Sequence, residues 1–172
     1  MNSVDAMVPK QVRAIANRFV LSFLLVAVLL FASIAPASAD NYDRQNLRES
    51  DFSHRDLRGD DFTRADMAMA DISYADLRGS RLFDTTLSLA NLEVANMTGA
   101  TLDGARFIRA NLTNAILEGA YAFDTDFRGA IIDGADFTDV MLAPKVNKML
   151  CEVAKGTNPV TGRDTRNTLY CS

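Results

Sequence analysis

A period of five residues runs through most of this 172-residue chain. From Leu47 to Leu142 every fifth residue is apolar, and 19 of these 20 residues are large. Alanine stands two residues earlier in seven consecutive repeats, from Ala90 to Ala120. A helix requires apolar residues about every 3.6 positions and a strand every second position, so neither explains the pattern. The sequence therefore predicts a backbone that repeats its own geometry every five residues.

The other three positions of the repeat are mostly polar, with Asp, Asn, Arg, Thr, Ser and Gly predominating. We expect the large apolar side chain to fill the interior, the small residue before it to line the wall, and the polar residues to face water. Seven glycines share one repeat position, which indicates a turn residue with positive φ. They are Gly59, Gly79, Gly99, Gly104, Gly119, Gly129 and Gly134.

Several repeats follow the pattern A-(D/N)-L-x-x closely. They include Ala65-Asp66-Met67, Ala75-Asp76-Leu77-Arg78-Gly79, Ala90-Asn91-Leu92, Ala110-Asn111-Leu112-Thr113-Asn114 and Ala135-Asp136-Phe137. Residues 43–142 thus resemble the pentapeptide-repeat family. The resemblance implies an all-β solenoid, a right-handed quadrilateral β-helix with four repeats in each coil. It further implies about five coils, with residue i stacked on residue i+20.

Ala122 is the one small residue of the apolar series. It leaves a gap in a predicted column whose other members are Phe62, Leu82, Leu102 and Leu142. The neighbouring Phe123 fills that gap only if the register shifts locally. We therefore expect a bulge or an irregular turn within Gly119–Thr125.

The N-terminal segment has the pattern of an export signal. Basic residues up to Arg18 precede an apolar run over residues 19–35, and Ala37-Ser38-Ala39 is acceptable to signal peptidase. We predict a signal peptide over residues 1–39, with cleavage before Asp40 and no stable membrane anchor afterwards. An uncleaved anchor is the alternative, although the apolar run is short for a membrane span.

The remaining chain divides into a repeat domain, residues 40–142, and a C-terminal cap, residues 143–172. The spacing of apolar residues predicts a helix over Pro144–Lys155, stopped by Gly156, and a second helical turn within residues 164–171. Cys151 and Cys171 are the only cysteines, and an exported pair is predicted to form a disulfide. A zinc site is the competing interpretation, but the single histidine is far away in sequence.

The tail also resembles the disulfide-closed, short α-helical C-terminal cap of exported pentapeptide-repeat proteins from the thylakoid lumen. Signal, repeat and tail occur here in the same order as in those proteins. The resemblance implies a location in the thylakoid lumen or the periplasm. The short leader suits a cyanobacterium better than a nuclear-encoded chloroplast protein.

Aspartate recurs at one repeat position six times in succession, at Asp51, Asp56, Asp61, Asp66, Asp71 and Asp76. Stacked carboxylates of this kind are candidates for binding a divalent cation or a cationic partner. Aspartate in this position also forms hydrogen bonds to the backbone of turns, and we favour that interpretation. No cofactor and no metal ligand is assigned from the sequence.

Catalysis is not predicted. His54 is the only histidine and stands among charged residues, without a serine or cysteine in an arrangement typical of a nucleophile. Residues 43–142 contain 10 Arg and 18 Asp or Glu, and such an acidic body disfavours nucleic acid as a partner. We expect a non-enzymatic structural or protein-binding module whose partner is another protein. A DNA mimic that modulates topoisomerases is the alternative, disfavoured by the export signal and the short solenoid.

Overall fold

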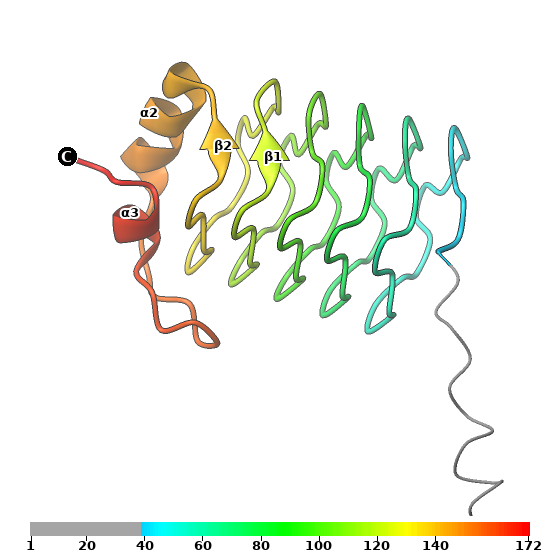
Figure 1. The fold of residues 1–172 in the computed structure, drawn as a ribbon, viewed down its shortest axis with the longest axis horizontal. Coiled ribbons are helices and arrows are strands. Elements are labelled where there is room, and N and C mark those ends of the chain that lie inside the picture. The colour runs from blue at the N-terminus through cyan, green and yellow to red at the C-terminus, as the bar shows by residue number, and fades with distance from the viewer. Residues whose placement is uncertain (1–38) are drawn as a thin grey trace, which may run out of the picture. The chain divides into compact units, whose positions relative to one another are not determined.

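A computed structural model describes residues 39–172 of the chain. These residues form a column of stacked coils that ends in two helices (Figure 1). The predicted signal peptide lies outside the described residues, apart from Ala39. Among residues 39–172, no helix is both long enough and apolar enough to cross a membrane.

Successive coils pair as parallel strands with an offset of 20 residues. The bridges run from Asn41↔Asp61 to Tyr121↔Met141, always at the residue before an inward apolar side chain. Only the last pair is extended enough to form strands, β1 (Tyr121–Ala122) and β2 (Met141–Leu142). The predicted stacking of residue i on residue i+20 is confirmed.

The predicted apolar series fills the interior of the column. Every member from Phe52 to Phe137 is buried, whereas the terminal members Leu47 and Leu142 are only partly buried. Aromatic rings stack between neighbouring coils, with 5.2 Å between the ring centroids of Phe107 and Phe127. This continuous core is the main source of stability in a fold whose strands are so short.

A turn begins at each inward apolar residue. The residue two positions further on has positive φ in all but one of these turns. The seven glycines predicted for this role have φ between 65° and 74°, so that prediction is confirmed. Larger residues adopt the same conformation at equivalent positions, including Tyr74 and Leu89. Their amides donate to carbonyl groups of the next coil, from Tyr74 to Glu93 at 2.9 Å and from Leu89 to Ile108 at 3.0 Å. Bonds of this kind offset the unfavourable backbone conformation.

The repeat containing Ala122 departs from this regular turn. From Arg44 to Asp139, Asp124 is the one residue at this turn position without positive φ. The amide of Phe123 donates instead to the Asp103 carboxylate at 2.8 Å. Ala122 keeps its buried place in the column and Phe123 points outward. The predicted irregular turn is therefore confirmed, but Phe123 does not fill the gap beside Ala122.

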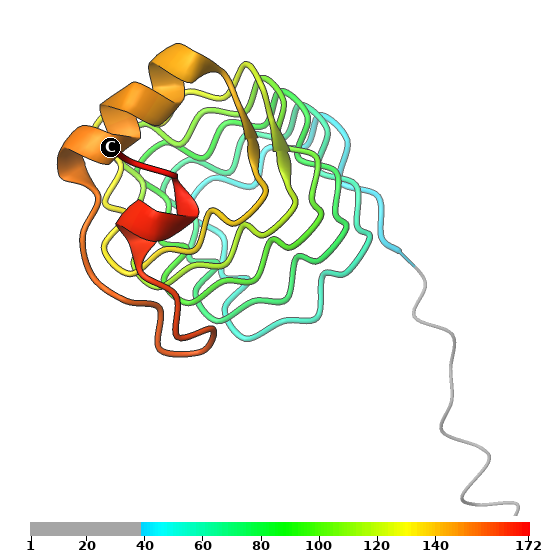
Figure 2. The ribbon, with the colours of Figure 1, turned by 60° about the vertical axis from the view of Figure 1, so that its left-hand side comes forward.

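Two helices, α2 (Pro144–Val153) and α3 (Thr165–Thr168), lie at the C-terminal end of the column (Figure 2). The prediction that the first helix runs to Lys155 and is stopped by Gly156 is wrong by two residues. Ala154 is already extended, and the Lys155 carbonyl accepts a hydrogen bond from the Gly134 amide at 2.9 Å. A Cβ atom at Gly156 would lie 2.9 Å from that amide nitrogen, so Gly156 allows the chain to approach the last coil closely.

A disulfide joins Cys151 of α2 to Cys171, which follows α3, with 5.6 Å between the two Cα atoms. Leu150 of α2 and Leu169 beyond α3 are buried and belong to the same hydrophobic core as the column. The core of the β-helix therefore continues into the helical end without an exposed apolar layer.

The different burial of two leucines gives a test of this packing. Leu112→Ala removes a fully buried side chain and should lower the free energy of unfolding by about 3 kcal/mol. Leu89→Ala changes a side chain that is 55% exposed and should alter it by less than about 0.5 kcal/mol. Urea denaturation of both variants measures the difference, and equal losses would contradict the assignment of the core.

Candidate functional site

The six aspartates of the predicted ladder each close their own turn. Asp51 and Asp71 pair across neighbouring coils, as do Asp56 and Asp76. In all six, one carboxylate oxygen accepts a hydrogen bond from the amide two residues further on, for example from Ser53 to Asp51 at 2.9 Å. These carboxylates therefore hold the turns that the fold requires.

Arginines on the same face pair with part of this ladder. Arg58 lies 2.6 Å from Asp56 and also reaches Asp76 at 3.7 Å. The hydrogen bond from Arg58 lowers the pKa of Asp56 to about 2. Both partners are exposed, so these ion pairs contribute little to stability. In the part of the chain that the structure describes, no group of three or more His, Cys, Asp or Glu residues is arranged to hold a metal ion.

His54 lies at a turn on the outside of the column. Its ring stacks on that of Tyr74 in the next coil, with 4.7 Å between centroids. This stacking accounts for the position of the histidine through packing alone.

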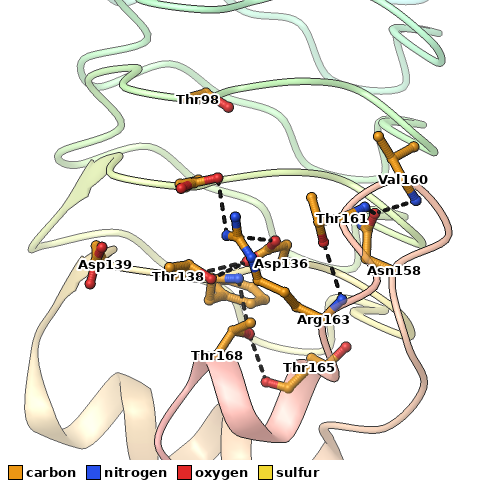
Figure 3. Close-up of polar contacts among 12 residues, drawn as sticks. Thr98, Asp136, Thr138, Asp139, Asn158, Val160, Thr161, Arg163, Thr165 and Thr168 are labelled. Atoms are coloured by element: carbon orange, nitrogen blue, oxygen red, sulfur yellow. Dashed lines mark hydrogen bonds and ion pairs between the residues drawn. The ribbon is translucent and has the colours of Figure 1, made fainter.

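The C-terminal cap is bound to the column by a polar network centred on Arg163. The Arg163 guanidinium lies 3.0 Å from Glu118 and 3.2 Å from Asp136, which belong to neighbouring coils (Figure 3). Asp136 is fully buried, and its carboxylate also accepts hydrogen bonds from the amide and the hydroxyl of Thr138. Burial raises the pKa of Asp136, but the Thr138 and Thr161 hydrogen bonds and the Arg163 charge bring it below its usual value. The carboxylate therefore stays ionised in the interior.

The cap also binds backbone groups of the last two coils. The buried Asn158 side chain donates to the carbonyl oxygens of Asn114 and Gly134, at 3.0 and 2.9 Å. The Thr168 hydroxyl accepts a hydrogen bond from the Phe137 amide at 3.1 Å (Figure 3). Thr168 thus replaces a partner that another coil would provide, whereas Asn158 binds carbonyl groups that the coil-to-coil pattern leaves free.

Exposed apolar side chains gather beside the irregular turn. Tyr121, Phe123 and Met141, which we call the C-terminal apolar surface, are each at least half exposed. Tyr121 and Met141 are bridge partners in adjacent coils, and Phe123 lies two residues from Tyr121 on the same face of the coil. The three side chains therefore lie close together, whereas other exposed apolar side chains, including Leu89 and Ile131, stand at other places on the column.

A groove of about 570 Å³ adjoins this surface, between α2 and the segment 123–128. Phe123, Phe127, Val146 and Met149 contribute its apolar lining. Three charged residues of α2 also line the groove: Lys145, Lys148 and Glu152. This shape suits an apolar side chain of another molecule better than a small polar substrate.

Sequence reasoning found the turn-forming aspartates, the cysteine pair and the disturbed repeat at Ala122, but missed Arg163, Asn158 and the apolar surface. Arg163 and Asn158 lie outside the repeat, so the period assigns them no place. Tyr121 and Met141 did leave a signal, because both stand at a repeat position that is usually polar.

The family model of pentapeptide repeats matches the chain with eight copies, in the segments 46–84, 75–114 and 102–142. A pentapeptide repeat protein from the thylakoid lumen of Arabidopsis thaliana has a similar structure, with a TM-score of 0.75. It is 42% identical, and the match covers 76% of this chain and 91% of that one. This likeness shows the same right-handed β-helical solenoid.

Two cyanobacterial pentapeptide repeat proteins match less well. One, involved in the regulation of heterocyst differentiation in Nostoc, is 24% identical with a TM-score of 0.38, covering 60% of this chain and 48% of that one. The other, from Cyanothece, is 27% identical with a TM-score of 0.30, covering 65% and 70%. No curated protein matches the chain.

Replacing the central arginine of the cap tests its contribution to stability. Arg163→Met leaves the buried Asp136 carboxylate without its cation and should lower the free energy of unfolding by about 2 kcal/mol at pH 7. Arg128→Met breaks the exposed pair with Asp126 and should cost less than about 0.5 kcal/mol. Thermal unfolding of both variants is the measurement.

The pH dependence checks the same interaction independently. Because the pKa of Asp136 is lower in the folded protein, its contribution to stability is present above pH ~3.9 and is lost as the pH falls through the folded value. Arg163→Met should raise the folded pKa of Asp136, so the acid-induced loss begins at a higher pH. An NMR titration in which the Asp136 carboxyl titrates identically in both proteins would contradict this account.

Proposed function

The chain belongs to the pentapeptide-repeat family, and from that membership we propose that it is an exported, non-enzymatic protein-binding module of the thylakoid lumen or periplasm. In this proposal the chain is cleaved before Asp40, and the mature form is a β-helix of about five coils closed by residues 143–172. Two observations support export. The similar Arabidopsis protein comes from the thylakoid lumen, and the Cys151–Cys171 disulfide requires an oxidising compartment to form and persist.

The C-terminal apolar surface carries the proposal of protein binding. Exposed Tyr, Phe and Met side chains are enriched at protein interfaces, and a contiguous patch of them is unusual on a soluble surface. The adjoining groove offers a concave site for an apolar anchor of the partner, which is the arrangement found at interface hot spots. We infer that a partner protein packs over Tyr121 and Phe123 and inserts a side chain between Phe127 and Met149.

The polar groups of the column support a non-catalytic role. The ladder carboxylates are hydrogen-bonded within their own turns, and the buried Asp136 is bound by Thr138 and Arg163. These groups are already committed to the fold, whereas a catalytic acid or base must have a site for substrate beside it.

Binding through this surface is tested with a matched pair of phenylalanines. Phe123 comes 40 residues after Phe83, so the two side chains occupy equivalent positions two coils apart, and both are exposed. The full chain, tagged at its C-terminus and exported in a cyanobacterial host, is used for affinity capture from the lumen and periplasm. Phe123→Ser should lose a partner protein that the wild type and Phe83→Ser both retain, by at least about tenfold in captured amount.

The identified partner is then titrated against the same three purified proteins. An equal affinity for all three would place the interface elsewhere, and the absence of any partner in both compartments would oppose a protein-binding role. Light scattering of the purified wild type examines self-association, because a dimer lost in Phe123→Ser would show that the surface binds a second copy instead.

The topoisomerase alternative is tested in a DNA gyrase supercoiling assay with the processed protein. We expect no inhibition at stoichiometric concentration, since the exposed acidic residues are largely paired with arginine or bound to their turns. Inhibition at that concentration would favour the DNA-mimic interpretation over the one proposed here.

A further inference from the structure

Asp60 is an acidic residue at the inward repeat position where alanine usually stands. The later residues of its column are Ser80, Ala100, Ala120 and Val140, none of them charged. Asp60 is only 5% exposed. Because a buried carboxylate is costly unless it is paired, its position requires a specific partner.

The partner in the structure is the backbone nitrogen of Asp40. This nitrogen donates to the Asp60 carboxylate at 2.8 Å across the first pair of coils. Within residues 39–172, no lysine or arginine forms an ion pair with Asp60. Its titratable neighbours are the carboxylates of Asp40 and Asp56 and the phenol of Tyr42.

These surroundings leave Asp60 short of positive charge. Burial raises the pKa of Asp60, and the Asp40 and Asp56 carboxylates raise it further, while the bond from the Asp40 nitrogen lowers it. A peptide N–H at this place supplies one donor and no net charge. An ammonium group would supply three donors and a full positive charge.

Asp40 is the residue that the predicted signal cleavage makes the first of the mature chain. Hydrolysis of the Ala39–Asp40 bond by signal peptidase consumes one water, leaves a carboxylate on Ala39 and releases the Asp40 amine. Free α-amino groups have an ordinary pKa of about 7.7–8.0, so this amine is mostly protonated at neutral pH. We propose that processing between Ala39 and Asp40 creates the counter-ion of Asp60, and that the new N-terminal ammonium caps the open end of the β-helix. This proposal rests on the predicted cleavage site.

The terminus is already held at the right place by other contacts. The Asp40 carbonyl accepts a hydrogen bond from the Asp61 amide at 2.9 Å. Two residues later, the Tyr42 ring stacks on Phe62 with 4.8 Å between centroids. These contacts position the Asp40 nitrogen beside Asp60, so cleavage changes the charge of the donor without moving it. Processing thereby stabilises the N-terminal coil after export.

The first test measures the protonation of the α-amine directly. The full chain is exported by a bacterial host, and intact-mass spectrometry of the product should show Asp40 as the first residue. The pH dependence of acetic anhydride labelling then gives the pKa of its α-amine. In the wild type this pKa should be at least about one unit above its value in Asp60→Asn, which makes labelling about sevenfold slower at pH 7.5.

Asp51→Asn is the matched control, because Asp51 is an exposed first-coil carboxylate bound to its own turn. Its α-amine should titrate as in the wild type. Equal pKa values in the wild type and in Asp60→Asn, or a mature chain that begins at another residue, would overturn the proposal.

A second variant serves if Asp60→Asn does not fold. Insertion of one serine between Ala39 and Asp40 moves the ammonium by one residue, about 3.8 Å along the chain, and restores an uncharged amide at Asp40. The melting temperature should fall by about 4 °C, and the α-amine pKa should return to its ordinary range. An unchanged melting temperature and a raised pKa would contradict the pairing. The protein-binding proposal is tested separately with Phe123→Ser, which leaves Asp40 and Asp60 unchanged. A negative result for the ammonium pairing therefore does not affect it.

Discussion

Hydrogen bonds between successive coils determine nearly everything else in this structure. The Leu92 amide donates to the Asn111 carbonyl at 2.8 Å, and the Asn111 amide donates to the Ala90 carbonyl at 3.0 Å. Because each bond joins residues about 20 apart, every repeat lies directly on its equivalent in the next coil. An inward residue must then fit the residue above it and the one below it, which explains why the interior accepts only a large apolar residue and a small one per repeat.

The same bonding leaves unpaired backbone groups wherever the stack ends. At the C-terminal end, Asn158, Thr168 and the Lys155 carbonyl bind groups of the last coil, and Arg163 joins that coil to the one before it. At the opposite end of the described residues, Asp60 stands as the counterpart of the buried Asp136. Asp136 receives its cation from an arginine, whereas for Asp60 we have proposed a terminal ammonium. Under that proposal, both ends pair a buried carboxylate with a charge from outside the column.

The proposed binding surface lies at a departure from regularity. A perfect repeat gives four similar polar faces with nothing to distinguish one from another. The small Ala122 coincides with an irregular turn, and beside it Phe123 points outward near Tyr121 and Met141. The C-terminal apolar surface therefore occurs at the one repeat where the regular turn is lost. In the proposed function this departure supplies the binding site, while the coils that support it stay regular.

The sequence alone determined the solenoid, its inward columns, the turn glycines and the disturbed repeat at Ala122. A period of five is a local property, and one repeat after another carries the same information. Only the tertiary structure showed that Arg163 meets Glu118 and Asp136, because such contacts join residues far apart in sequence with no repeat to relate them. It also showed that Asp60 lies beside the backbone nitrogen of Asp40. The stacking of residue i on residue i+20 brings the two residues together, but the hydrogen bond between them and the burial of the carboxylate depend on how the side chain lies, which the period does not determine.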